Sequence, residues 1–174
     1  MNVETIMRDG PVIPVLVIDD ISQAQPIAEA LVAGGVRVLE VTLRTPAALD
    51  VIAEMSCVKG AIVGAGTVLN PSDLDAAIKA GAKFIVSPGL TEPLGKAAIA
   101  SGIPFLPGIS NAGDLMRGLD LGLSRFKFFP AIASGGFLRS ALSLHRLERR
   151  GFVPPVGLRS TRHRNGLPKI SSLV

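Results

Sequence analysis

The sequence has no tryptophan, no tyrosine and only one cysteine, Cys57. Seven phenylalanines are its only aromatic residues, which argues against a single-strand nucleic-acid binder, because such proteins stack bases on aromatic rings. A lone cysteine excludes a disulfide framework and indicates a reducing, cytoplasmic setting. No apolar run reaches the roughly 18 residues that a membrane-spanning helix needs, and residues 1–10 lack the basic and then apolar pattern of a signal segment.

Histidine is scarce as well. The two histidines, His145 and His163, both lie near the C-terminus. With no earlier histidine and one cysteine, the sequence offers no set of zinc ligands at the strand ends. We therefore expect a metal-free reaction without a cofactor.

Acidic residues are almost missing from the end of the chain. The net charge is +4, from 18 Lys and Arg against 14 Asp and Glu. Residues 1–136 contain 10 basic and 13 acidic residues, a balance of −3, whereas residues 137–174 contain 8 basic residues and only Glu148, a balance of +7. We therefore expect one folded domain over 1–136 and a separate, irregular basic tail over 137–174.

The folded part contains a repeating unit: an alanine-rich helix, a glycine turn and a short apolar strand. Gly81, Gly102 and Gly122 mark three such turns, since glycine supplies the left-handed residue that follows a helix. Strands that alternate with helices at this spacing form parallel βαβ units. The pattern predicts six strands, near residues 12–18, 37–43, 61–67, 84–88, 104–108 and 125–130.

Parallel units of this kind build either a doubly wound sheet or a barrel. In the strand at 37–43, Glu40 and Thr42 fall on one face and the apolar residues between them on the other. A polar face turned inward favours the barrel. Residues 64–69 carry Leu69 where a dinucleotide-binding turn needs its third glycine. The expected fold is an α/β, TIM-type (β/α)8 barrel of which six strands are recognisable.

Lys127 lies in the last predicted strand, within an otherwise apolar run. Burial frees a lysine amine to attack carbonyl groups; the alternative is a strand-edge lysine whose charged end reaches water. Barrel enzymes build their sites at the C-terminal ends of the strands, where this chain places Glu40 and Arg44. We predict a Schiff base between Lys127 and a keto substrate, proton transfer by Glu40, and Arg44 as a cation for an anionic substrate.

Each of these side chains also has a purely structural interpretation. Glu40 can be an ion-paired carboxylate, and Arg44 can cap a helix or hold Glu40 in place. Thr67 and Pro88 are common as plain turn residues. Ser110 can cap a helix instead of binding phosphate. Taken singly, these residues leave both interpretations open.

Five stretches together closely resemble one family, in sequence and in order. They are Gly34–Thr45 (GGVRVLEVTLRT), Val63–Leu69 (VGAGTVL), Ser87–Pro93 (SPGLTEP), Leu106–Ser110 (LPGIS) and Phe126–Ala131 (FKFFPA). The family is that of the 2-keto-3-deoxy-6-phosphogluconate (KDPG) and 4-hydroxy-2-oxoglutarate (KHG) aldolases. The resemblance runs from about Gly10 to Gly136.

The resemblance implies a role for each matching residue. Lys127 corresponds to the Schiff-base lysine and Glu40 to the general acid/base. The positions that shape the pyruvate end of the family's pocket are matched by Arg44, Thr67, Pro88 and Phe129.

The implied reaction cleaves 2-dehydro-3-deoxy-6-phosphogluconate to pyruvate and glyceraldehyde 3-phosphate, a step of the Entner–Doudoroff pathway. The resemblance also implies a cytoplasmic homotrimer with no nucleic-acid or membrane partner. A sister aldolase that acts on the phosphogalactonate analogue or on 4-hydroxy-2-oxoglutarate is the alternative.

The resemblance stops near Gly136. Ile132 stands where the family usually has a glutamate. The family continues with two more strands, the seventh of which ends in Arg-Phe-Cys-Pro-Thr-Gly-Gly, whose glycines bind the substrate phosphate. Codons read out of register over Arg150–Leu158 can encode that heptapeptide. We infer a reading-frame shift shortly after residue 130.

The inferred shift has a physical consequence. Six strands cannot close an eight-stranded barrel without exposing two sheet edges. We therefore expect the literal 174-residue product to be poorly folded and weakly active, and the frame-restored protein to be an active aldolase. A third hypothesis is a non-catalytic remnant whose basic tail binds anionic polymers.

Overall fold

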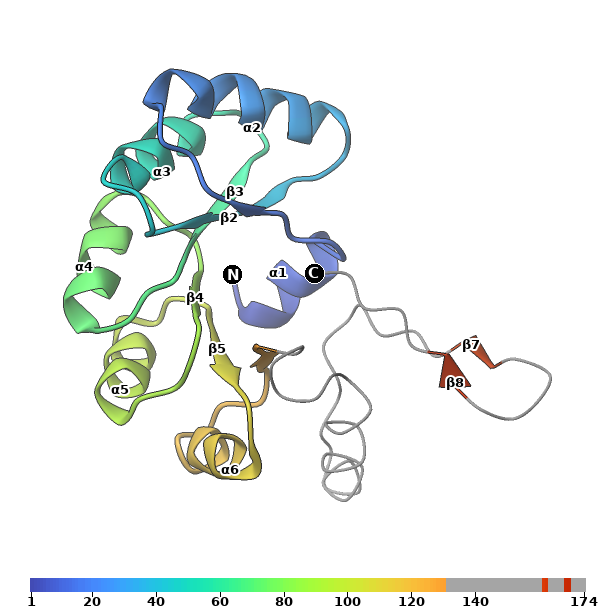
Figure 1. Ribbon diagram of the computed structural model, residues 1–174, viewed down its shortest axis with the longest axis vertical. Helices are drawn as coiled ribbons and strands as arrows, with labels where there is room; N and C mark the ends of the chain where they lie inside the picture. Colours follow the sequence, from blue (N-terminus) through green and yellow to red (C-terminus); the bar gives the residue numbers. More distant parts are fainter. Residues whose placement is uncertain (131–160, 163–167, 170–174) are drawn as a thin grey trace.

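The computed structural model describes residues 1–130, 161–162 and 168–169. Its main feature is one parallel sheet in which six strands follow the order of the chain (Figure 1). The strands are β1 (Val15–Leu16), β2 (Val38–Thr42), β3 (Ile62–Gly66), β4 (Ile85–Ser87), β5 (Phe105–Ile109) and β6 (Lys127–Phe128). All six predicted strands are therefore confirmed, as a half-barrel.

Helices connect these strands on the convex side of the sheet (Figure 1). Asn70 caps α4 with its side chain and Pro71 follows at the first helical position, as expected of a helix start. Gly81, Gly102 and Gly122 all adopt a positive φ, which confirms the predicted glycine turns. The connecting helices are α2 (Ala24–Ala33), α3 (Ala48–Ser56), α4 (Pro71–Lys79), α5 (Glu92–Ser101) and α6 (Ala112–Asp120), with a 3-10 turn, η1 (Ile21–Gln23), before α2.

The two faces of β2 divide the interior into two layers. Leu39 and Val41 are fully buried between the sheet and the helices. Val38 lies on the opposite, concave face in an inner apolar cluster, and Glu40 and Thr42 share that face because side chains alternate along a strand. The predicted alternation is therefore confirmed, with the polar residues turned toward the inside.

A short first helix, α1 (Val3–Asp9), lies on the concave side of the sheet and was not predicted. Asn2 caps it by accepting a hydrogen bond from the Thr5 N–H. Ile6 enters the inner apolar cluster, and Glu4 lies 3.4 Å from Arg125, just before β6. The helix thus links the first and the last parts of the half-barrel. Its 7 residues are too few for a periodic signal.

Two further strands, β7 (Thr161–Arg162) and β8 (Pro168–Lys169), pair in antiparallel fashion. The rest of the predicted basic tail, 137–174, lies outside the described residues. Among the helices of the described ranges, none has the length and apolar character that crossing a membrane requires.

The inner packing of α1 yields a stability prediction. Replacing Ile6 with alanine should lower the free energy of unfolding by about 2–4 kcal/mol, because a buried large-to-small change loses apolar burial and leaves a cavity. Urea denaturation measures the change. Arg8→Ala on the same helix is the control, since Arg8 makes only an exposed ion pair of small value. Equal effects of the two substitutions would contradict the packing role of α1.

Candidate active site

Lys127 and Glu40 meet inside the half-barrel. The Lys127 Nζ donates to the Glu40 carboxylate, at 3.4 Å from Oε1 and 3.5 Å from Oε2. Lys127 belongs to β6 and Glu40 to β2, and three strands separate them in the sheet. The contact therefore spans the concave side and depends on the curvature of the sheet.

Glu40 is almost enclosed, with 5% of its surface exposed. It lies in the middle of β2, paired in register with Val15 of β1 and Gly64 of β3. Burial raises the pKa of the Glu40 carboxyl above its ordinary value, and the nearby charges of Lys127 and Arg44 offset part of that rise. A carboxyl group in this setting is suited to take up and return protons.

Lys127 is more accessible than the sequence suggested. Its side chain is 29% exposed, and β6 is the last strand of the described sheet. Its Nζ lies 5.5 Å from the centre of the Phe129 ring, within the range of a cation–π contact. The amine is thus held by a carboxylate and a ring but remains open to a ligand.

The other predicted residues follow strand ends at the same edge of the sheet. Arg44 is exposed two residues after β2, and its charge reaches Glu40. Thr67 directly follows β3 with a φ of 59°, a strained conformation for a β-branched residue and one that clusters at functional sites. Pro88 follows β4 and Phe129 follows β6. Lys127 therefore lies beside both Glu40 and the Phe129 ring, and the other three residues follow the ends of β2, β3 and β4.

Ser110 is not itself the helix cap that one of its two interpretations predicted. Its N–H and its hydroxyl both donate to Asp114, and Asn111 beside it caps α6. It therefore helps to fix the start of a helix.

One glycine beside the site, Gly108, lets two neighbouring strands approach closely. A Cβ at Gly108, the register partner of Lys127, would overlap the Pro88 carbonyl group. The signal was the position of this glycine inside an apolar strand, where glycine indicates a close approach of another backbone. In the described ranges, no three His, Cys, Asp or Glu side chains form a group that could hold a metal ion.

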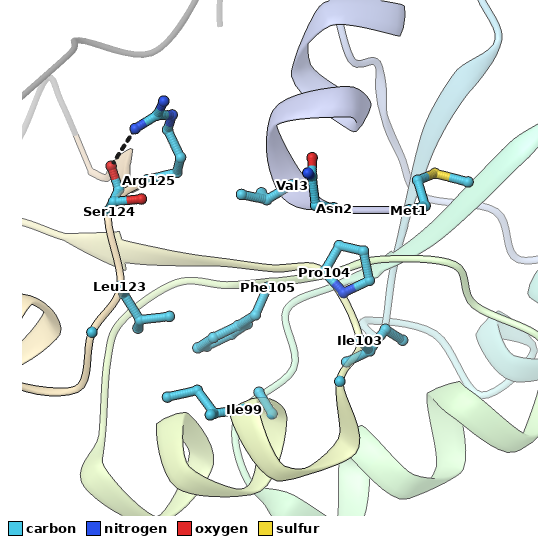
Figure 2. Close-up of a pocket in the computed structure, with 13 residues that line it drawn as sticks. Met1, Asn2, Val3, Ile99, Ile103, Pro104, Phe105, Leu123, Ser124 and Arg125 are labelled. Atoms are coloured by element: carbon cyan, nitrogen blue, oxygen red, sulfur yellow. Dashed lines mark hydrogen bonds between the residues drawn. The ribbon is translucent and has the colours of Figure 1, made fainter.

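A pocket of about 280 Å³ lies at the opposite end of the half-barrel (Figure 2). Residues near the N-terminal ends of α1, β5 and β6 line it, among them Val3, Phe105 and Arg125. None of the predicted site residues borders this pocket. It is therefore separate from the edge that carries Lys127.

Fold and site together define an α/β-barrel type of enzyme with an amine and a carboxylate in contact on the concave side of its sheet. The chain belongs to the KDPG and KHG aldolase family, which matches it over residues 3–173. The predicted family is thus confirmed, and its members are carbon–carbon lyases.

Two relatives illustrate the match. The chain is 58% identical to the 2-dehydro-3-deoxy-phosphogluconate aldolase of Zymomonas mobilis over 162 residues, covering 92% of the chain and 77% of the relative. It is 50% identical to the KHG/KDPG aldolase of Escherichia coli K12 over 167 residues, covering 95% and 78%.

Solved structures agree with these relatives. The KDPG aldolase of Legionella pneumophila, with pyruvate captured as a covalent carbinolamine intermediate, superposes with a TM-score of 0.82 at 40% identity, covering 91% of the chain and 77% of that structure. A KDPGal structure is more distant, with a TM-score of 0.64 at 28% identity, covering 70% and 60%.

The raised pKa of Glu40 predicts a pH dependence of stability. A carboxyl whose folded-state pKa is raised contributes stability that is present at low pH and is lost as the pH rises above about 4.5 toward the folded-state pKa. Glu40→Gln should remove this loss. Urea denaturation at several pH values gives the unfolding free energy of each protein. The value for Glu40→Gln minus the value for the parent should therefore increase as the pH rises through that window.

Lys127→Met provides the matched comparison. Without the Lys127 charge, which lowers the folded-state pKa of Glu40, the same increase should begin at the same pH but continue to higher pH and become larger. A difference that stays constant with pH in both backgrounds would contradict the burial of Glu40.

Proposed function

We propose that the site cleaves 2-dehydro-3-deoxy-6-phosphogluconate to pyruvate and glyceraldehyde 3-phosphate through a Schiff base on Lys127. The observation that carries the proposal is the contact of the Lys127 amine, at 3.4 Å, with the buried carboxylate of Glu40. Strong identity to a 2-dehydro-3-deoxy-phosphogluconate aldolase supports the choice of substrate. The reaction needs no metal and no cofactor.

The proposed steps use an amine and one proton carrier. The Lys127 amine adds to the C2 keto group, and loss of water from the carbinolamine gives an imine. The imine accepts the electron pair of the C3–C4 bond as that bond breaks, while the C4 hydroxyl gives its proton to Glu40, directly or through water. Glu40 then returns the proton to C3 of the enamine, and water hydrolyses the imine to release pyruvate.

The neighbouring residues have supporting roles in this proposal. Arg44 provides a positive charge for the substrate carboxylate. Thr67 and Pro88 border the part of the active site that holds the pyruvate portion of the substrate. Phe129 lies beside the Lys127 amine. Their positions at one edge of the sheet support this assignment.

Related keto acids are candidate substrates. The Escherichia coli relative is a KHG/KDPG aldolase, and we propose 4-hydroxy-2-oxoglutarate as a second substrate because cleavage requires only the keto group and the C4 hydroxyl. The phosphogalactonate analogue is the weaker alternative, since the KDPGal structure is only 28% identical.

We further propose that the complete enzyme is an eight-stranded barrel and that part of 137–174 is read out of frame. The reversal of charge after residue 136 and the alternative codons of Arg150–Leu158 support the shift. In the described sheet, β1 and β6 each pair on one side only, so two more strands would fit between them.

Trapping experiments test the site. Borohydride reduction in the presence of pyruvate should label Lys127 and leave Lys127→Met unlabelled, as read by peptide mass spectrometry. Lys83→Met, a substitution at an exposed lysine near β4, is the control and should be labelled at Lys127. Labelling elsewhere, or equal labelling of Lys127→Met, would overturn the proposed nucleophile.

A turnover assay tests the reading-frame proposal. The frame-restored protein should show full turnover with 2-dehydro-3-deoxy-6-phosphogluconate, and the 174-residue chain much less. Normal turnover by the 174-residue chain would contradict the proposal that its barrel is incomplete. Resequencing the codons for residues 128–140 locates the shift directly.

Assembly and location complete the proposal. We propose a homotrimer, on the family resemblance and on exposed apolar side chains such as Met116 and Leu119 of α6, because such side chains are common at subunit contacts. Sedimentation equilibrium of the frame-restored protein should give three times the chain mass; a monomer would contradict the trimer. The exposed thiol of Cys57 supports a reducing, cytoplasmic location.

A further inference from the structure

The inner face of β3 carries glycine at two successive inward positions. Gly64 pairs in register with Glu40, and Gly66 with Thr42, so both lie on the face that these two residues share. Two residues of β3 therefore contribute no side chain to the interior beside Glu40. Glycine weakens a strand interior, so its presence there indicates that something else approaches closely.

The group that approaches Gly66 is the Glu40 side chain. A Cβ at Gly66 would overlap Glu40 Oε1 and would lie only 2.7 Å from its Cγ and 2.8 Å from its Cδ. The three nearest atoms thus all belong to Glu40. At Gly64, by contrast, a Cβ would lie 2.5 Å from the ring of Phe84. Gly66 makes room for the Glu40 carboxylate, and Gly64 makes room for the Phe84 ring in the apolar core.

We propose that Gly66 is a positioning residue for Glu40: the missing side chain lets the carboxylate lie against the backbone of β3, directed at the Lys127 amine. The inference rests on the proposed function for the catalytic role of Glu40. The close approach of Glu40 to Gly66 is independent of that function. Gly66 does not have a positive φ, so alanine can adopt its backbone conformation. Any cost of Gly66→Ala therefore arises from the contact with Glu40.

Displacing the carboxylate should alter the chemistry more than the binding of ligand. The charged groups that face Glu40 are Lys127 on β6 and Arg44 just after β2. A side chain at Gly66 pushes the carboxylate off β3 and changes its distance to both cations. A misplacement of about 1 Å can lower a rate on the order of 100-fold. We expect a loss of that size in the rate of pyruvate imine formation at Lys127, and a shift of the acidic limb of its pH profile.

A double-mutant cycle tests the contact without any need for activity. In the frame-restored protein, Gly66→Ala should lower the melting temperature by roughly 3–8 °C relative to the parent, as expected of overpacking. In the Glu40→Ala background the same substitution should cost little, because the atoms it would overlap are gone. Equal losses in the two backgrounds would overturn the inference.

Gly64→Ala is the matched control on the same strand and face. It should lower the melting temperature in both backgrounds, since it meets Phe84, and leave the pH profile of borohydride trapping with pyruvate in place. Gly66→Ala should shift that profile and slow trapping. If the frame-restored parent fails to trap pyruvate, the proposed function is contradicted, and the melting-temperature cycle alone decides on Gly66. Normal trapping by Gly66→Ala contradicts the positioning role.

Discussion

The site depends on keeping the Glu40 carboxylate inside the half-barrel. A buried charge of this kind costs several kcal/mol unless a partner and good geometry compensate for it. Here Lys127 supplies a cation at 3.4 Å, and Arg44 adds a more distant one. The raised pKa of Glu40 shows that these charges offset the burial only in part. A carboxyl whose pKa is raised by burial holds a proton more readily than an exposed one, which suits a group that takes up a proton and returns it.

One strand serves both stability and chemistry. Val38 and Glu40 lie two residues apart, so both point to the same face of β2. Val38 packs in the inner apolar cluster, and the Glu40 carboxyl lies on the same face, nearer the C-terminal end of the strand. Ile6 of α1 and Phe84 complete that inner cluster. The apolar layer therefore lies beneath the carboxyl and separates it from the far end of the half-barrel, where the pocket of Figure 2 is located.

Much of this architecture was predictable because it depends on local rules. Apolar runs and glycine turns located the six strands, and period-2 alternation put Glu40 on the inner face. The meeting of Glu40 with Lys127 was not predictable from local pattern, because it depends on how strongly the whole sheet curves. The exposure of Lys127 and the docking of α1 likewise depend on which elements pack against them. The positive φ of Thr67 leaves no trace in residue type, since threonine seldom adopts it.

The two members of the central pair are held with different firmness. Glu40 lies in the middle of a five-residue strand with neighbours on both sides, so its backbone is fixed by the main body of the sheet. Lys127 lies in a two-residue strand that pairs with β5 alone within the described residues. If Lys127 is the nucleophile and Glu40 the proton carrier, as proposed, the position of Lys127 depends far more on strands beyond β6 than the position of Glu40 does. An incomplete barrel would then keep the carboxyl in place and would first lose the orientation of the amine.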